Sequence, residues 1–520
     1  ASLGRFLIGE VPWWHWGRPL LFWSLLLILT YVMLMAFNVL IFRQWAYNEK
    51  LTYPLAELPQ ILAGKDDIDG QYHVPPIFRN GLFWSGFCVS ALVLGWNLLC
   101  FSNLIPGLQP LDQWLKWTPY IQNTIFSGLL PSAKSTIFFT LIGLAFLTPA
   151  RISFSLWFFS LFYMAQLLFL VWGGHGVDEK SFPMEWYYTL NFRTAEGGGA
   201  LIVFSAVVMY KCRRYILCFF TPKVLRDLGQ TEQREMRISS FLFIFGSAAL
   251  VLMLWIGMGA NIWFTIFTYM VIMVITIGVT RSVAEGGMLG FQAWISPFHF
   301  IRTIFGMNKA WTAPGLFAPL MIYFSVMFLD LKTFIAPAMA NCIKIRDDLR
   351  ISRVQFHFAV ILAIGLAAVA AIVTTLVMAY TIGANNMNSW FFNAFPRDLY
   401  NQIASMARTP PVDTANTVWW LAFGALFMAG LLYFRQFLFW LPHPIGMIML
   451  VNPLMRTYWF SFFVGWLAKS IVTKYGNKDS YERVRNFFIG LIAGELFVVV
   501  LAIVVSLITG RTISIDLNRN

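Results

Sequence analysis

The chain has 520 residues, of which 58% are apolar and only 12% are charged, and its formal net charge is +13. Soluble domains usually carry about a quarter of charged residues. The composition therefore excludes an ordinary soluble enzyme, a secreted disulfide scaffold and a disordered chain. A mean hydropathy of +0.67 agrees with an integral membrane protein built of helices.

The positive charge stands mostly in short loops between apolar runs. This pattern is typical of cytoplasmic loops that contact the anionic lipid of the bilayer, and we expect no nucleic-acid partner. The chain begins at Ala1, and no signal-peptide pattern precedes its first apolar run. This start is compatible with a longer natural N-terminus that holds further spans.

Apolar runs and their flanks predict about 14 segments along the chain. In chain order they are 20–42, 81–101, 135–149, 152–172, 197–210, 239–258, 261–280, 312–328, 333–343, 354–380, 418–433, 437–451, 457–471 and 487–508. They predict an all-α, polytopic transmembrane helix bundle with about 11–14 membrane segments and internal pseudo-symmetry. The short segments are expected to be broken or re-entrant helices. No linker divides the chain, so we expect residues 1–520 to form a single integral membrane domain.

The charge of the loops predicts how the segments cross the membrane. If the N-terminus lies outside, the first three inside pieces carry 12 Lys and Arg and the first three outside pieces carry 6. Cytoplasmic loops are enriched in these residues. We therefore predict cytoplasmic loops near 43–80, 211–238, 344–353 and 469–485, and an external segment near 381–416. The expected location is the bacterial inner (cytoplasmic) membrane.

An Arg/Ala-Glu-Gly-Gly element occurs twice, and its two glutamates are 89 residues apart. Each copy leads directly into or out of apolar sequence, and the duplication indicates an internal repeat. The candidate residues of a substrate or ion pathway are Arg193, Glu196, Gly197 and Gly198 in the first copy and Arg281, Glu285, Gly286 and Gly287 in the second.

A carboxylate inside a span is costly, and paired glycines weaken a helix by about 1 kcal/mol each relative to alanine. Both features predict irregular backbone beside an acidic side chain, as in the midplane sites of transporters. On a continuous helix, Arg193 and Arg281 would each face the glutamate that follows and neutralise it. The alternative is a pair of interfacial turns, with Arg and Glu at the headgroups and glycines that allow close packing.

Glu495 is a candidate proton carrier in the last segment, next to the spacing Gly490-xxx-Gly494. Within ten positions its only basic neighbour is Arg485. An acidic residue at this depth is expected to face protein or water and not lipid. The alternative is a hydrogen-bonded structural carboxyl group.

Motifs of common enzymes are missing from the sequence. It has no P-loop, no HExxH, no GxSxG and no GxGxxG motif. Its six histidines and five cysteines are scattered without a metal-ligand spacing. We therefore expect neither an enzyme nor a bound cofactor or metal.

Two stretches resemble a known group of transporters. The first is Arg43-Gln-Trp-Ala-Tyr-Asn-Glu49-Lys50-Leu51-Thr52-Tyr53-Pro54-Leu55-Ala56, in which an acidic–basic–Leu run leads to an aromatic–Pro pair. The second is a C-terminal block that contains Pro442-His-Pro444-Ile-Gly446, residues 458–469 and Phe487-Phe-Ile-Gly490-Leu-Ile-Ala-Gly494. In these stretches the chain is similar to the oligopeptide transporter superfamily and to a related uncharacterised bacterial family of polytopic membrane proteins.

The resemblance implies a helical transporter with pseudo-symmetric halves that moves peptides or metal chelates together with protons. The Asn-Pro-Gly and Asn-Lys-Glu-His elements of the peptide-transporting branch are absent from the sequence, which leaves the substrate class open. The leading hypothesis is a secondary transporter of a small polar solute, proton-coupled and of the symport type. The alternative is a non-transporting structural subunit. We expect either a homo-oligomer or a larger membrane complex.

Overall fold

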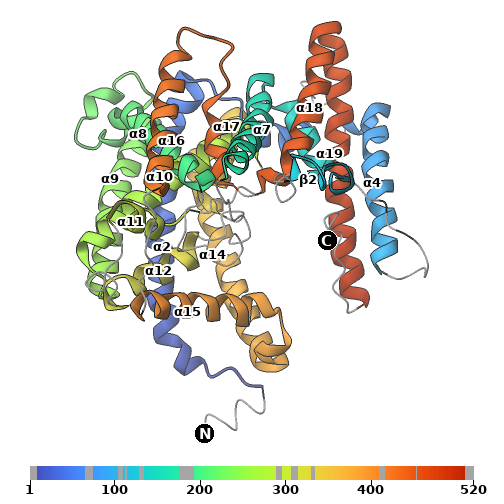
Figure 1. Cartoon of the computed structure of the whole chain (residues 1–520). Helices are drawn as coiled ribbons and strands as arrows, with labels where there is room; N and C mark the ends of the chain where they lie inside the picture. Colours follow the sequence, from blue (N-terminus) through green and yellow to red (C-terminus); the bar gives the residue numbers. More distant parts are fainter. Residues whose placement is uncertain are drawn as a thin grey trace.

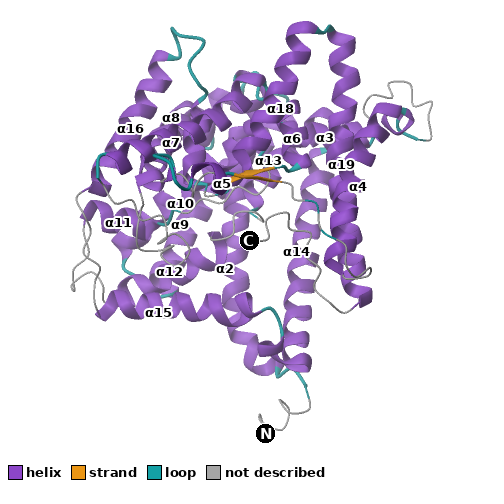
Figure 2. Ribbon diagram, turned by 45° about the vertical axis from the view of Figure 1, so that its right-hand side comes forward, coloured by secondary structure: helices purple, strands orange, loops and turns teal. Residues whose placement is uncertain are grey.

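The computed structural model describes most of the chain as a helical bundle (Figures 1 and 2). The described residues are 9–64, 74–102, 109, 111, 114–127, 134–174, 192–288, 295–305, 314–328, 334–408, 416–452 and 454–509. Within them, eight helices are long and apolar enough to cross a membrane. The predicted polytopic, all-helical membrane fold is confirmed.

The helical elements follow the predicted apolar runs closely. The long helices are α2 (Trp13–Arg43), α4 (Gly81–Ser102), α7 (Ala150–Trp172), α8 (Phe192–Ile216), α9 (Gln230–Leu252), α10 (Ile262–Gly286), α14 (Arg353–Met378) and α19 (Lys478–Thr509). The shorter ones are α3 (Pro54–Leu62), α5 (Thr118–Ile121), α6 (Phe139–Leu147), α11 (Pro297–Phe305), α12 (Pro314–Phe328), α13 (Ile335–Asp348), α15 (Phe395–Arg408), α16 (Asn416–Phe434), α17 (Pro444–Ile448) and α18 (Met455–Tyr475).

Short irregular elements extend or connect these helices. The π-helical turns are η1 (Gln44–Asn48), η6 (Met253–Gly257), η8 (Ala379–Gly383) and η10 (Trp390–Ala394). The 3₁₀ turns are η2 (Pro76–Arg79), η5 (Pro222–Leu225), η9 (Ala384–Asn386) and η11 (Met449–Val451). The strands β1 (Trp114–Lys116) and β2 (Lys134–Thr136) form one antiparallel pair, with Leu115 opposite Ser135.

Two predicted segments are broken, as expected for short apolar runs. Segment 135–149 contains the end of β2 and then the nine-residue α6, in which every residue except Phe139 is buried. Segment 437–451 begins with turns and then forms the five-residue α17 and the 3₁₀ turn η11, both completely buried. Each short helix is followed by a long one, α7 or α18.

These elements form two repeats that pack reciprocally. The first repeat is α4, α6, α7 and α8, and the second is α16, α17, α18 and α19. Helix α4 packs along α19 and α16 packs along α8, while α6 packs on α18 and α17 packs on α7. A two-fold rotation that exchanges the repeats turns the α4–α19 contact into the α16–α8 contact. It likewise turns the α6–α18 contact into the α17–α7 contact. The predicted internal pseudo-symmetry is therefore present in the packing.

Glycine contacts show the two-fold relation at the level of single residues. A Cβ atom on Gly490 of α19 would stand 2.0 Å from the carbonyl oxygen of Phe83 in α4. A Cβ atom on Gly199 of α8 would stand 1.9 Å from the carbonyl oxygen of Leu421 in α16. Both helix pairs therefore approach so closely that only glycine fits at the contact.

The same relation holds in the reverse direction of each contact. A Cβ atom on Gly86 of α4 would meet the carbonyl oxygen of Phe487 in α19 at 2.1 Å. A Cβ atom on Gly424 of α16 would meet the carbonyl oxygen of Glu196 in α8 at 1.9 Å. In each helix pair, both helices therefore contribute one glycine to the close contact.

Serine hydroxyls support the short helices in the same reciprocal way. Phe138 is the N-cap residue of α6, and its N–H donates to Ser461 Oγ of α18 at 2.9 Å. His443 is the N-cap residue of α17, and its N–H donates to Ser155 Oγ of α7. Each short helix therefore begins on a serine of the long helix from the other repeat.

The two repeats run in opposite directions. Helices α4 and α19 are parallel, since Phe83 lies beside Gly490 and Leu94 packs with Val498 further along both helices. The loop that joins α18 to α19 and the loop that follows α16 both lie at the top of Figures 1 and 2. Helix α19 therefore begins where α16 ends. The repeat is inverted, an arrangement found in many secondary transporters.

The four basic loops predicted to be cytoplasmic meet at one face of the bundle. The ion pairs between them include Arg43–Glu232 at 2.6 Å, Arg346–Glu235 at 2.5 Å and Arg485–Glu57 at 3.9 Å. At the other end of α2, Trp16 Nε1 donates to the Tyr380 hydroxyl in η8 at 3.2 Å. The loops therefore lie together as predicted, and their assignment to the cytoplasm stays a prediction.

Candidate functional site

The first Arg/Ala-Glu-Gly-Gly copy does not interrupt its helix. Helix α8 runs without a break from Phe192 to Ile216, so the expectation of irregular backbone is wrong at this copy. Its glycines serve close packing instead. A Cβ atom on Gly197 would stand 2.8 Å from the backbone nitrogen of Val451, and one on Gly198 would stand 2.8 Å from the Ile295 side chain.

The second copy does end its helix. Helix α10 stops at Gly286, and Gly287 takes a left-handed conformation with φ of +63°. A glycine in this conformation is a common helix terminator because it has no Cβ atom to clash. Thr148 Oγ1, just after α6, donates to the carbonyl oxygen of Gly286 at 3.4 Å. The ends of α6 and α10 therefore lie together.

Three further residues surround Glu285 and Arg281 in a buried charged cluster. Arg281 Nε donates to Glu285 Oε2 at 2.6 Å, which confirms that the arginine faces its glutamate. Arg281 Nη1 lies 2.6 Å from Glu49 Oε2, and His443 Nε2 lies 3.1 Å from Glu285 Oε1. The guanidinium carbon lies 5.2 Å from the centre of the Trp45 ring. Two carboxylates from distant segments thus share one buried arginine.

His443 joins this cluster to the start of α17. The backbone N–H of Ile445 donates to His443 Nδ1 at 3.4 Å, so Nε2 is the nitrogen that carries a proton toward Glu285. Burial holds the pKa of His443 below its usual range, and the hydrogen bond to Glu285 opposes this shift. The imidazole therefore acts as a neutral donor at neutral pH.

Tyr53 adds an unpaired hydroxyl next to the charged cluster. The side chain is 1% exposed, and its backbone is held at a φ of +47° where α3 begins. Burial raises the pKa of the phenol above its usual value, while the charge of Arg281 lowers it. Among the described residues the Tyr53 hydroxyl has no hydrogen-bond partner. Its hydrogen-bonding capacity is therefore unused within the described part of the chain.

Arg193 binds the far end of the segment formed by α17 and η11. Its Nε donates to the carbonyl oxygen of Leu450 at 2.8 Å, and its Nη2 donates to that of Asn452. The guanidinium carbon also lies 5.2 Å from the centre of the Tyr163 ring. Arg193 therefore does not pair with Glu196 through the contacts shown, although the two are three positions apart on α8.

Glu196 is buried without a charged partner in the described part of the chain. It is 0% exposed, and Gln166 Nε2 donates to its Oε1 at 3.4 Å. Its Oε2 has no hydrogen-bond partner there. A buried polar atom without a partner is costly, so Glu196 is the carboxyl group here that most needs a proton, cation or polar ligand.

Glu495 lies at the beginning of the other short helix. Its Oε2 accepts the backbone N–H of Thr140 in the first turn of α6 at 2.5 Å. At the opposite end, Lys469 Nζ donates to the carbonyl oxygens of Leu147 at 3.4 Å and Thr148 at 2.7 Å. The predicted proton carrier thus stabilises the N-terminus of a buried helix, where a negative charge is favourable.

The buried charged residues share one geometric role. They satisfy the backbone groups that lack an intrahelical partner at the ends of α6 and of the α17–η11 segment. An acidic group lies at the beginning of each segment. Glu495 binds the first turn of α6 directly, and Glu285 contacts the beginning of α17 through His443. Basic groups lie at their ends, from Lys469 and Arg193.

Sequence reasoning found Arg281, Glu285 and Arg193 but not the partners that complete their contacts. Glu49 and His443 stood only in the two stretches of family resemblance, and His443 was otherwise counted among six scattered histidines. The signal for His443 was its place before Pro444, which makes it an N-cap residue. Within the described residues, no group of three or more His, Cys, Asp or Glu could hold a metal ion.

Comparison with known proteins places the chain in one family. Residues 4–516 match the family described as "Family of unknown function (DUF6785)". The comparison with curated proteins gave no match. The protein is therefore a multi-pass helical membrane protein that belongs to the DUF6785 family.

Proposed function

We propose that the protein is a secondary transporter that moves a small polar solute, such as a peptide or a metal chelate, together with protons. The observation that carries this proposal is the inverted repeat with a short buried helix in each half. Transporters use such repeats to form a site that opens alternately to either side of the membrane. The stretches that resemble oligopeptide transporters support the same function.

The buried polar groups provide candidate roles in this transport cycle. We assign Glu196, Glu285 and Arg281 to solute contact, because Glu196 Oε2 and the Tyr53 hydroxyl beside Arg281 have no hydrogen-bond partner among the described residues. We assign proton carriage to Glu495. Protonation of its carboxylate would weaken the hydrogen bond to Thr140 and loosen the N-terminus of α6. A proton would thereby change the position of a short helix that lies between the repeats.

A cross-link between the repeats tests whether they move relative to one another. The rings of Trp157 in α7 and Phe463 in α18 face each other across the two-fold axis, with centroids 5.3 Å apart. In a background without the five native cysteines, we expect a flexible cross-link between W157C and F463C to abolish uptake in proteoliposomes. Phe154 and Phe158 stack within α7 at 5.4 Å, and a cross-link between F154C and F158C should leave uptake intact.

Single substitutions test the assigned roles under an imposed pH gradient. We expect E495Q to abolish proton-driven accumulation and to leave solute exchange, whereas E285Q should weaken solute binding itself. Thermal unfolding of both variants separates these effects from loss of fold. Normal transport by both variants would refute the assignment of the residues but not the transport function.

A non-transporting structural subunit is the second candidate function, and α14 favours it. None of the residues of this apolar helix is buried. Near its start Phe356 and Val360 pack against the core, and in the described part of the chain most of the remaining length of the helix is exposed. A subunit of a larger complex would cover such a helix with a partner chain. If the protein moves no peptide, amino acid or metal chelate under any gradient, and purifies with a partner on α14, this second function replaces the first.

A further inference from the structure

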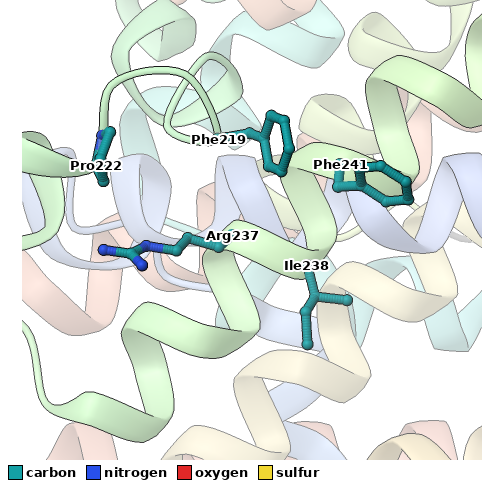
Figure 3. A pocket seen from close by; sticks show the side chains of 5 residues that line it. All are labelled: Phe219, Pro222, Arg237, Ile238 and Phe241. Atoms are coloured by element: carbon teal, nitrogen blue, oxygen red, sulfur yellow. The ribbon is translucent and has the colours of Figure 1, made fainter.

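A surface groove lies between the turn that follows α8 and the middle of α9 (Figure 3). It has a volume of about 310 Å³ and is lined by Phe219, Pro222, Arg237, Ile238 and Phe241. We propose that this groove binds one anionic phospholipid of the surrounding membrane. Its phosphate would pair with the Arg237 guanidinium, and an acyl chain would lie against the phenyl rings.

The groove lies where the sequence of α9 changes from polar to apolar. Residues 230–237 contain six charged or amide side chains, and Arg237 is the last charge before a long apolar run begins at Ile238. Such a boundary marks the level of the lipid headgroups. Arg237 is exposed there, as are Ile238, Phe241 and Phe219. A phospholipid needs this order of groups: a cation at the headgroup and apolar surface below it.

The wall of the groove is held in place by hydrogen bonds to α9. Ser240 Oγ accepts the N–H of Phe219 at 3.1 Å and donates to the carbonyl oxygen of Ile216 at 2.5 Å. The Phe219 and Phe241 rings are 5.4 Å apart between centroids, and Phe241 and Phe245 are 4.5 Å apart. A preformed wall lowers the entropy lost when a flexible chain binds.

The charge around the groove is complementary to an anionic lipid. Segment 211–238 holds seven Lys and Arg against three Asp and Glu. Two of the acids, Glu232 and Glu235, already pair with bases of other helices, Arg43 and Arg346. The basic residues of the segment therefore keep an uncompensated excess at the membrane surface. A guanidinium binds phosphate oxygens through two parallel hydrogen bonds, which makes Arg237 the specific contact.

The test uses the purified full chain in a zwitterionic detergent, titrated with phosphatidylglycerol or phosphatidylcholine. Thermal unfolding gives the apparent affinity, and native mass spectrometry counts the retained lipids. We expect phosphatidylglycerol to raise Tm more than phosphatidylcholine, and R237Q to weaken this effect about tenfold. Arg234 is an exposed residue of the same helix that does not line the groove, so R234Q should change the affinity less than about twofold.

Three results would overturn the proposal. Equal losses in R234Q and R237Q would mean diffuse attraction to a charged surface without a site. Equal effects of the two lipids would mean that the headgroup is not recognised. Binding of inorganic phosphate or glycerol phosphate as tight as that of the lipid would identify a free anion as the ligand. If the acyl chain binds as proposed, F241A weakens lipid binding and leaves its salt dependence unchanged.

Discussion

The buried charged side chains of this protein face backbone atoms and one another more than they face an open path. Arg281 bridges Glu285 and Glu49, while Arg193 binds carbonyl oxygens. Breaking a buried ion pair by removal of one partner typically costs about 3–5 kcal/mol. These groups are therefore part of the fold as well as candidates for function, and variants at them need a stability measurement beside any transport assay.

His443 should make the stability of the protein dependent on pH. Because its folded-state pKa lies below the usual value, the unfolded chain takes up the proton first when the solution is acidified. Well above the unfolded-state pKa of about 6.5, the residue is neutral in both states and contributes no slope. Below this value, stability falls until the pH passes the folded-state pKa.

The variant H443N tests this dependence, since asparagine is also a good N-cap residue. Thermal unfolding between pH 8 and 5 should show a smaller loss of Tm in H443N than in the unmodified protein. An identical slope in both proteins would assign the acid sensitivity to other groups.

At the scale of single residues, the sequence predicted one of the two expected contacts within a helix and missed the contacts between helices. The four-residue spacing of Arg281 and Glu285 was sufficient to predict that they pair. Glu49 and His443 reach the same arginine–glutamate pair from segments far away in the chain, and no local pattern encodes that meeting. The predicted pairing of Arg193 with Glu196 is wrong, because the Arg193 guanidinium donates instead to the carbonyl oxygens of Leu450 and Asn452.

At the scale of helices, the same residue type serves opposite purposes. Gly287 ends α10 because it adopts a left-handed conformation, whereas Gly199 lies within α8 because α16 leaves no room for a Cβ atom. The sequence shows Glu-Gly-Gly at both places and cannot distinguish the two uses. The shortness of segments 135–149 and 437–451 correctly predicted broken helices there. The same expectation is wrong for segments 197–210 and 457–471, which lie in the continuous helices α8 and α18 because polar residues extend both helices beyond their apolar runs.

Glycine-to-alanine substitutions test the close helix contacts. A Cβ atom would overlap backbone oxygen at Gly490 and at Gly199, so we expect G490A and G199A each to destabilise the protein, by similar amounts of about 1–3 kcal/mol. Gly95 of α4 has nothing within 4 Å of its Cβ position. The control G95A should therefore be neutral or stabilising by up to about 1 kcal/mol, since alanine favours the helix.

Thermal unfolding of the purified variants measures both effects. Destabilisation of G490A with an unchanged G199A would contradict the equivalence of the two contacts. Equal behaviour of G95A and G490A would contradict the close approach itself.

At the scale of the whole molecule, ion pairs connect the basic loops at one face, and α14 carries the chain to the other. Glu235 of α9 pairs with Arg353 and His357 at the start of α14, with His357 Nε2 at 2.7 Å. The other end of α14 lies near the start of α2, as the contact of Trp16 with Tyr380 shows. The Lys and Arg residues of the loops predicted that these loops share one face. Their distribution reflects how the chain inserts into the membrane and does not depend on how its helices pack.

Cysteine labelling in intact cells tests the sidedness. A cysteine at position 230 should be accessible from the cytoplasm, and a cysteine at position 390 from the opposite side, in a background without native cysteines. Labelling of both positions from the same side would contradict the topology, whatever the function of the protein.

The inverted repeat also has a consequence for the origin of the chain. Two units of one design that meet in opposite orientations derive most simply from gene duplication and fusion. The ancestral unit, a short protein resembling α4 to α8, would have inserted into the membrane in both orientations and formed an antiparallel homodimer. The glycines at 86 and 490, and those at 424 and 199, would then descend from one pair of glycines at the interface of that dimer. In this view, the segment from α9 to α15 is a later addition that joined the two copies.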